Sequence, residues 1–150
     1  MTDGWTIHRT SALSGATFPF EIIHADGPAN NMRRFHWHEF VEISYIRRGC
    51  GRYEIEDEAF SVQPRDFVVI NSDERHRLTF DEREPVHETV MHFEPSLICP
   101  SGGAQFDSEY LRLFLSHGPA AGKRPPVAPA ELTRMERLLS AIQQEFETRG

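Results

Sequence analysis

Residues 35–42, which read FHWHEFVE, constrain this chain more than any other segment. Side chains alternate between the two faces of a β-strand, so His36, His38 and Glu42 are predicted to point the same way. Two imidazoles and a carboxylate on one face form part of a site for Zn²⁺, Fe²⁺, Mn²⁺ or Ni²⁺. His76 follows the turn NSDER and opens a later strand, so we expect it to be the fourth ligand.

A second interpretation of these four residues stays open. They can instead be polar pocket residues that bond to an organic ligand or to each other. Tyr53 is a further candidate for ligand binding through its hydroxyl, although an ordinary core tyrosine would show the same pattern. The other histidines, His92 among them, are expected to be ordinary surface or core residues.

Short apolar segments separated by turn residues dominate the first two thirds of the chain. Such segments, with turns every 8–12 residues, are typical of a β-sandwich or barrel. The strands are expected at 18–25, 35–48, 51–56, 59–63, 66–71, 76–80 and 86–93. The sequence therefore predicts a mainly β fold.

The last third is predicted to be helical. We expect a short helix at 107–117, an irregular linker at 117–130 and a final helix that starts near residue 129. An apolar stripe runs along that helix through Leu132, Met135, Leu138, Leu139, Ile142 and Phe146. An isolated helix of this length is marginal in water, so the stripe must be buried, either in a dimer or against the chain's own barrel.

Charge argues against direct contact with nucleic acid. The 16 Lys and Arg residues are outnumbered by 23 Asp and Glu residues, which gives a net charge of −7. A phosphate-binding domain would need a basic face. No apolar run is long enough to span a bilayer and the start of the chain lacks an apolar signal region, so we expect a cytoplasmic protein with no membrane partner.

The spacing of the histidines resembles the first motif of the cupin family. That motif is HxH, three residues, Glu, six residues and Gly, and here it is met by His36, His38, Glu42 and Gly49. The glycine that precedes it in the family falls at Asn30. The resemblance implies a cupin-type double-stranded β-barrel, or jelly roll, followed by C-terminal helices.

Several less specific features of the sequence are similar to those of the N-terminal domain of AraC-type regulators. They are the turn at 49–51, the strand start at 64–66 and the segment HFEPSLI at 92–98, while only His76 survives from the second cupin motif. The resemblance covers about residues 18–149. It implies a barrel at 1–100 and a helical extension at 101–150 of the same domain, which together bind an effector and form a homodimer.

The same resemblance implies what the partners are. The effector would be a small molecule, either a sugar or a small organic acid, bound directly or through a divalent metal. DNA would be contacted only through a helix-turn-helix domain that is absent from this chain, so we expect a truncated regulator rather than an enzyme. The alternative is a small stand-alone metal-dependent cupin enzyme, such as a dioxygenase or an isomerase.

Overall fold

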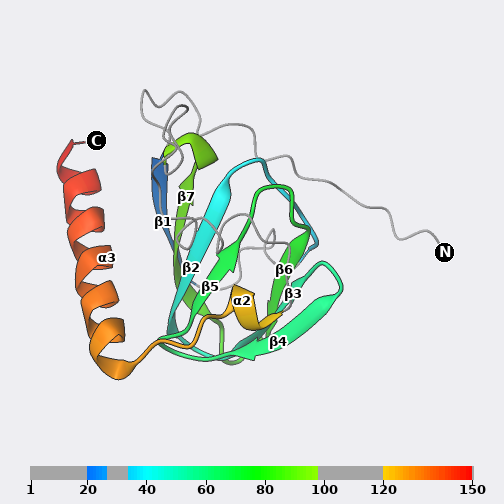
Figure 1. Ribbon diagram of the computed structural model, residues 1–150. Helices are drawn as coiled ribbons and strands as arrows, with labels where there is room; N and C mark the ends of the chain where they lie inside the picture. The colour runs from blue at the N-terminus through cyan, green and yellow to red at the C-terminus, as the bar shows by residue number, and fades with distance from the viewer. Residues whose placement is uncertain (1–19, 27–33, 98–119, 150) are drawn as a thin grey trace.

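The computed structural model describes residues 20–26, 34–97 and 120–149. Two antiparallel sheets form the fold, one with the strand order β1-β7-β2-β5 and one with the order β4-β3-β6 (Figure 1). The strands are β1 (Phe20–Asp26), β2 (Val41–Arg48), β3 (Gly51–Ile55), β4 (Glu58–Val62), β5 (Phe67–Ile70), β6 (His76–Phe80) and β7 (His87–Phe93). A short 3-10 helix η1 (Pro95–Leu97) and the helices α2 (Ala120–Lys123) and α3 (Pro129–Arg149) follow. The predicted mainly β barrel with a C-terminal helix is confirmed.

One strand boundary differs clearly from the sequence prediction. The predicted strand at 35–48 becomes regular only at Val41, because the preceding backbone bends away from the sheet. The turn that follows β5 holds this bend, since Asp73 N–H donates to the His38 carbonyl (2.8 Å) and Ser72 Oγ donates to the Glu39 carbonyl (2.7 Å). Before the bend, His36 forms an isolated bridge with His76.

The prediction of an irregular linker at 117–130 was partly wrong, because this segment contains the helix α2. This four-residue helix is held by Lys123, a buried side chain that is ion-paired with the buried carboxylate of Glu74. The predicted helix at 107–117 lies outside the described residues. No helix in the described part of the chain is both long and apolar enough to cross a membrane.

An apolar core fills the barrel interior between the two sheets. Alternate residues of each strand point inward, as the pleat requires. The core is made of Ile46, Tyr53, Ile55, Val62, Val68, Ile70, Leu78 and Val86. On β2 the same inward face carries Glu42 and Ser44, and on β7 it carries Glu88, so the barrel interior is polar at some positions.

A second apolar cluster lies on the other face of the larger sheet, where α3 packs (Figure 1). Leu132, Met135 and Leu139 of the predicted stripe contact this sheet. Tyr45 Oη donates to Glu136 (2.6 Å), which fixes the helix to β2. The rest of the stripe is more open: Leu138, Ile142 and Phe146 are 55%, 37% and 39% exposed.

Candidate metal centre

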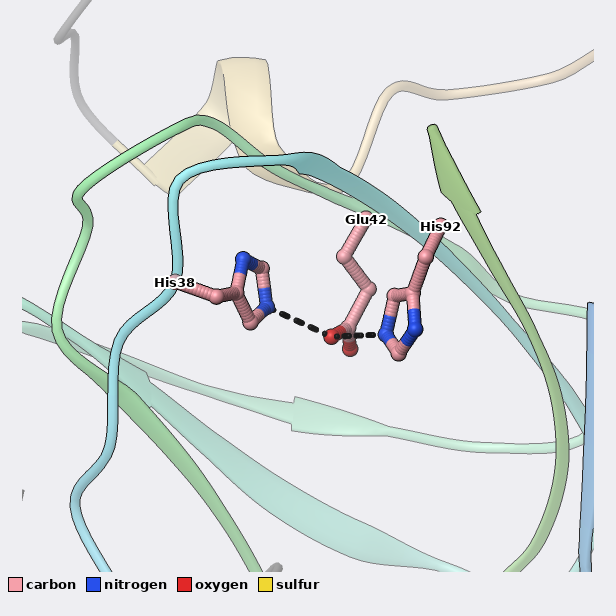
Figure 2. A group of neighbouring side chains, drawn as sticks. All are labelled: His38, Glu42 and His92. Atoms are coloured by element: carbon pink, nitrogen blue, oxygen red, sulfur yellow. Dashed lines mark hydrogen bonds and ion pairs between the residues drawn. The ribbon is translucent and has the colours of Figure 1, made fainter. Parts of the chain in front are cut away.

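Three potential ligands meet at one end of the barrel interior (Figure 2). Nε2 of His38 and Nε2 of His92 each lie 3.0 Å from the same Glu42 oxygen. One ligand atom from each residue lies within 4.8 Å of the others. His38 comes from the segment before β2, Glu42 from β2 itself and His92 from the neighbouring strand β7, where it pairs directly with Glu42.

Two of the predicted ligands, His36 and His76, lie beside this group and are not part of it. The rings of His36 and His76 lie 4.2 Å apart, centroid to centroid, because the isolated bridge places their backbones side by side. Nε2 of His76 lies 3.7 Å from the Glu42 carboxylate. That nitrogen is buried and has no hydrogen-bond partner among the described residues, although buried polar atoms almost always have one.

Backbone carbonyls fix the orientation of three of the rings. The Nδ1 atoms lie 2.8–2.9 Å from carbonyl oxygens, which belong to Arg34 for His36, to Phe40 for His38 and to Glu74 for His76. A carbonyl can only accept, so each Nδ1 carries a proton and each neutral ring presents the Nε2 lone pair. Metal-binding histidines are held in the same way, with the second ring nitrogen bonded to a carbonyl or carboxylate.

The charges of the site favour a cation. Burial by itself would raise the pKa of Glu42, but the surrounding His38, His76 and His92 outweigh it and hold that pKa well below its usual range. Burial acts to lower the pKa of His76, yet the Glu42 carboxylate outweighs burial and raises it. Burial and the nearby His76 lower the pKa of His36 to about 4, so this ring is neutral.

These observations test whether a metal fits. A neutral His38 ring would point a lone pair at the Glu42 carboxylate from 3.0 Å, and two acceptors at this distance repel unless a proton or a cation lies between them. Imidazole nitrogens with a carboxylate suit Zn²⁺, Mn²⁺, Fe²⁺ or Ni²⁺. The residues present therefore fit a divalent metal ion.

A cavity of about 120 Å³ lies beside the cluster. His36, His38, Glu42, His76 and His92 line one part of it, and Ile23, Ala25, Tyr53, Leu78 and Val90 line the rest. A larger and more open hollow of about 510 Å³ surrounds Cys50 and Arg52, but none of the histidines lines it. We place the site in the smaller cavity, because the buried ligating groups converge there.

Next to Tyr53 of the cavity wall, a buried carboxyl binds two hydroxyls. Glu88 accepts hydrogen bonds from Ser44 and from Tyr53 Oη, the latter at 2.9 Å. Burial and the charge of Glu42 raise the pKa of Glu88 to about 7. Burial and the charge of Glu88 likewise raise the pKa of Tyr53 well above its usual value, so the Tyr53 hydroxyl stays protonated.

All five residues predicted to bind a metal or ligand line this one cavity, namely His36, His38, Glu42, Tyr53 and His76. Strand alternation placed His36, His38 and Glu42 on one face, but the strand is not continuous through them, because the bend before Val41 interrupts it. His92 was dismissed as ordinary, yet it contacts Glu42. Its alternation with Glu88 and Val90 along β7 was the signal that could have found it.

Two comparisons concern the sequence of this chain. The family model for the AraC-like ligand binding domain matches residues 17–148. No curated protein matches the sequence.

Among solved structures, a Bacillus subtilis oxalate decarboxylase variant is similar, with 20% identity over 53% of this chain and 22% of that chain, at a TM-score of 0.43. A putative mannose-6-phosphate isomerase from Ralstonia eutropha JMP134 has 20% identity over 50% and 72% of the two chains, at 0.39. The lyase DddQ from Ruegeria pomeroyi DSS-3, which acts on DMSP, has 22% identity over 51% and 38%, at 0.41. This chain thus spans about a fifth of the oxalate decarboxylase chain.

Proposed function

The chain belongs to the AraC-like ligand binding domain family, and from this premise we propose that it is the ligand-sensing and dimerisation domain of an AraC-type transcription regulator. One observation carries the proposal: buried histidines and a carboxylate line a cavity inside the barrel. The barrel at 1–100 and the helical extension at 101–150 act as one domain. DNA would be contacted by a helix-turn-helix domain outside this chain, because the net charge of −7 opposes the phosphates.

A divalent metal, one of Zn²⁺, Ni²⁺, Fe²⁺ or Mn²⁺, is proposed as the cofactor. His38, Glu42 and His92 would hold it, with His76 as the additional ligand and His36 beside it. When bound, the ion supplies a Lewis-acidic positive charge that anchors the effector. The unpartnered Nε2 of His76 supports this assignment, since a metal would satisfy it.

The effector is a small molecule, either a sugar or a small organic acid, that enters the cavity. Its binding would shift the equilibrium between two arrangements of the domain. A coupling free energy of about 1–3 kcal/mol between effector and domain arrangement is enough to change DNA occupancy. The bond between Tyr45 of β2 and Glu136 of α3 offers a direct connection, because β2 also carries Glu42.

A homodimer is proposed through α3. Leu132, Met135 and Leu139 pack on the chain's own sheet, and the ring of Phe146 contacts Phe20 of β1. This leaves Leu138, Ile142 and the exposed part of Phe146 open to a second copy. Exposed apolar side chains in a row on one helix are typical of an association surface.

A metal-dependent enzyme, such as a dioxygenase or an isomerase, is the second candidate. The observation that favours it is the cavity beside the ligand cluster, which gives a substrate room to reach a bound metal. An enzyme and a sensor differ in what happens to the ligand. A sensor returns the ligand unchanged, whereas an enzyme converts it.

The proposal is tested in two steps. Isothermal titration with Zn²⁺ and Ni²⁺ should show one ion per chain, and His38→Ala should remove it while His87→Ala, at a half-buried position outside the ligand group, should not. The metal-loaded domain is then screened against small acids and sugars by thermal stability, and each ligand that binds is recovered and analysed by mass spectrometry. Recovery of unchanged ligand supports the sensor, and recovery of a product supports the enzyme.

A further inference from the structure

We infer that the cavity selects a small carboxylate with a short apolar body and excludes sugars. The inference rests on the proposed function, because the carboxylate would be anchored at the metal-loaded histidine end. It narrows the two effector classes to one and assigns a role to the apolar wall of the cavity, which the metal chemistry does not use.

The volume of the cavity limits the size of its ligand. The cavity measures about 120 Å³. An apolar cavity of about 150 Å³ holds benzene, with about six carbon atoms. A pentose or hexose ring with its hydroxyls is considerably larger than benzene, so the cavity cannot enclose it.

The polar end of the cavity favours an anionic ligand. Metal ligation requires neutral imidazoles and an ionised carboxylate. Glu42 is the one carboxylate among the described residues that line the cavity. A divalent ion there therefore leaves a net positive charge in a buried place, where an unpaired charge is costly. An anionic ligand would neutralise it, and a neutral ligand would not.

The wall opposite the histidines is apolar and favours an aliphatic ligand body. Ile23, Ala25, Leu78 and Val90 line it, and none of these side chains donates or accepts a hydrogen bond. Tyr53 is the exception, but its hydroxyl hydrogen is already donated to Glu88. A sugar placed here would find no hydrogen-bond partner on this wall, and each hydroxyl that it buried there would cost about 1–3 kcal/mol. An aliphatic body would gain instead from burial against this wall.

The test uses the zinc-loaded domain and three probes in isothermal titration. Isobutyrate carries the charge and the apolar body, isobutyramide has the same shape without the charge, and D-ribose represents the sugars. We expect isobutyrate to bind, isobutyramide to bind at least about tenfold more weakly and D-ribose not to bind. Equal binding of isobutyrate and isobutyramide, or binding of D-ribose as tight as that of isobutyrate, would overturn the inference.

Two variants of the apolar wall sharpen the test. Ala25→Leu fills the cavity, and Val90→Thr places a hydroxyl on its wall with little change in shape. Both should weaken isobutyrate binding by about tenfold or more while zinc affinity stays within about twofold. The control is Ala59→Leu, the same substitution on an exposed position of β4, which should change neither affinity. Unchanged isobutyrate binding in both wall variants would place the acid elsewhere.

The outcomes of these titrations also distinguish failure of this inference from failure of the proposed function on which it rests. Failure of zinc to bind the wild-type domain removes the metal centre, and the inference falls with it. Zinc binding without a preference for isobutyrate leaves the metal centre standing and overturns the inference alone.

Discussion

Glu42 and His92 face each other across the pair of strands β2 and β7, with Nε2 of His92 3.0 Å from Oε2 of Glu42. His38 approaches the same oxygen from the bend before β2, also at 3.0 Å (Figure 2). A strand, its antiparallel neighbour and a bend therefore supply one potential ligand each.

Removal of His92 should weaken metal binding. Loss of an outer-shell partner alone costs about 10–100-fold in metal affinity, so His92→Ala should cost at least this much if His92 is a ligand. Isothermal titration with Zn²⁺ measures the effect. His87→Ala, five residues earlier on the same strand and outside the cluster, is the matched control. An unchanged affinity in His92→Ala would show that His92 is not a ligand.

Glu88 should make the domain less stable as the pH rises. Burial and the charge of Glu42 raise the pKa of Glu88 from 4.5 to about 7 in the folded chain. The folded state therefore keeps a proton that the unfolded state has lost. The stability contribution is fully present below about pH 4.5 and is lost as the pH rises through about 7, by a total of about 3 kcal/mol.

Glu88→Gln removes this ionisation. Urea unfolding at pH 5 and pH 8 should therefore show a variant whose stability, relative to the wild type, improves at the higher pH. The titration of Glu42 and His76 is common to both proteins and cancels from the difference to first order. Glu84→Gln, at an exposed position, should show no such trend. A stability difference that is the same at both pH values would contradict the assignment.

The ion pair between Lys123 and Glu74 should be important for stability, because both side chains are buried. Lys123→Met deprives the buried Glu74 carboxylate of this cation, which typically costs about 3–5 kcal/mol. Chemical unfolding measures the loss, and Glu74→Gln added to Lys123→Met should recover part of it. Arg134→Met, in an exposed pair, should cost little. A loss below about 1 kcal/mol in Lys123→Met would mean that Glu74 is satisfied in another way.

Two adjacent leucines of α3 should differ sharply in their contribution to the folded chain. Leu139 is 7% exposed and packs on the sheet, so Leu139→Ala should lower the free energy of unfolding by about 2–4 kcal/mol. Leu138 is 55% exposed, so Leu138→Ala should change it by about 0.5 kcal/mol or less when measured on the monomer. Equal losses would contradict the packing of α3.

The exposed part of the stripe should control association. Ile142→Glu places a charge one turn from the exposed Leu138, and it should shift a dimer toward monomer in sedimentation velocity experiments. Gln144→Glu adds the same charge at another exposed position of α3 and should leave the dimer intact. A wild-type domain that sediments as a monomer at high concentration would remove the dimer proposal.

Local patterns in the sequence determined much of this fold. Alternation along the strands and the turn residues between them predicted the seven strands, with the start of β2 as the one large difference. The spacing of His36, His38, Glu42 and Gly49 indicated the barrel type, and the family match confirms it. The periodicity of the last segment predicted α3. These features depend on residues close together in the chain, so the sequence carries them directly.

Tertiary structure alone decided how the elements meet. His92 joins Glu42 because β7 pairs with β2 across 50 residues of sequence, and no local pattern reports that register. The bend at His38 depends on hydrogen bonds from the distant turn at 71–76. Likewise, the α3 stripe is divided into packed and exposed side chains by the sheet it contacts. Pairing and packing between segments far apart in the chain set these features, because barrel closure satisfies all such contacts together.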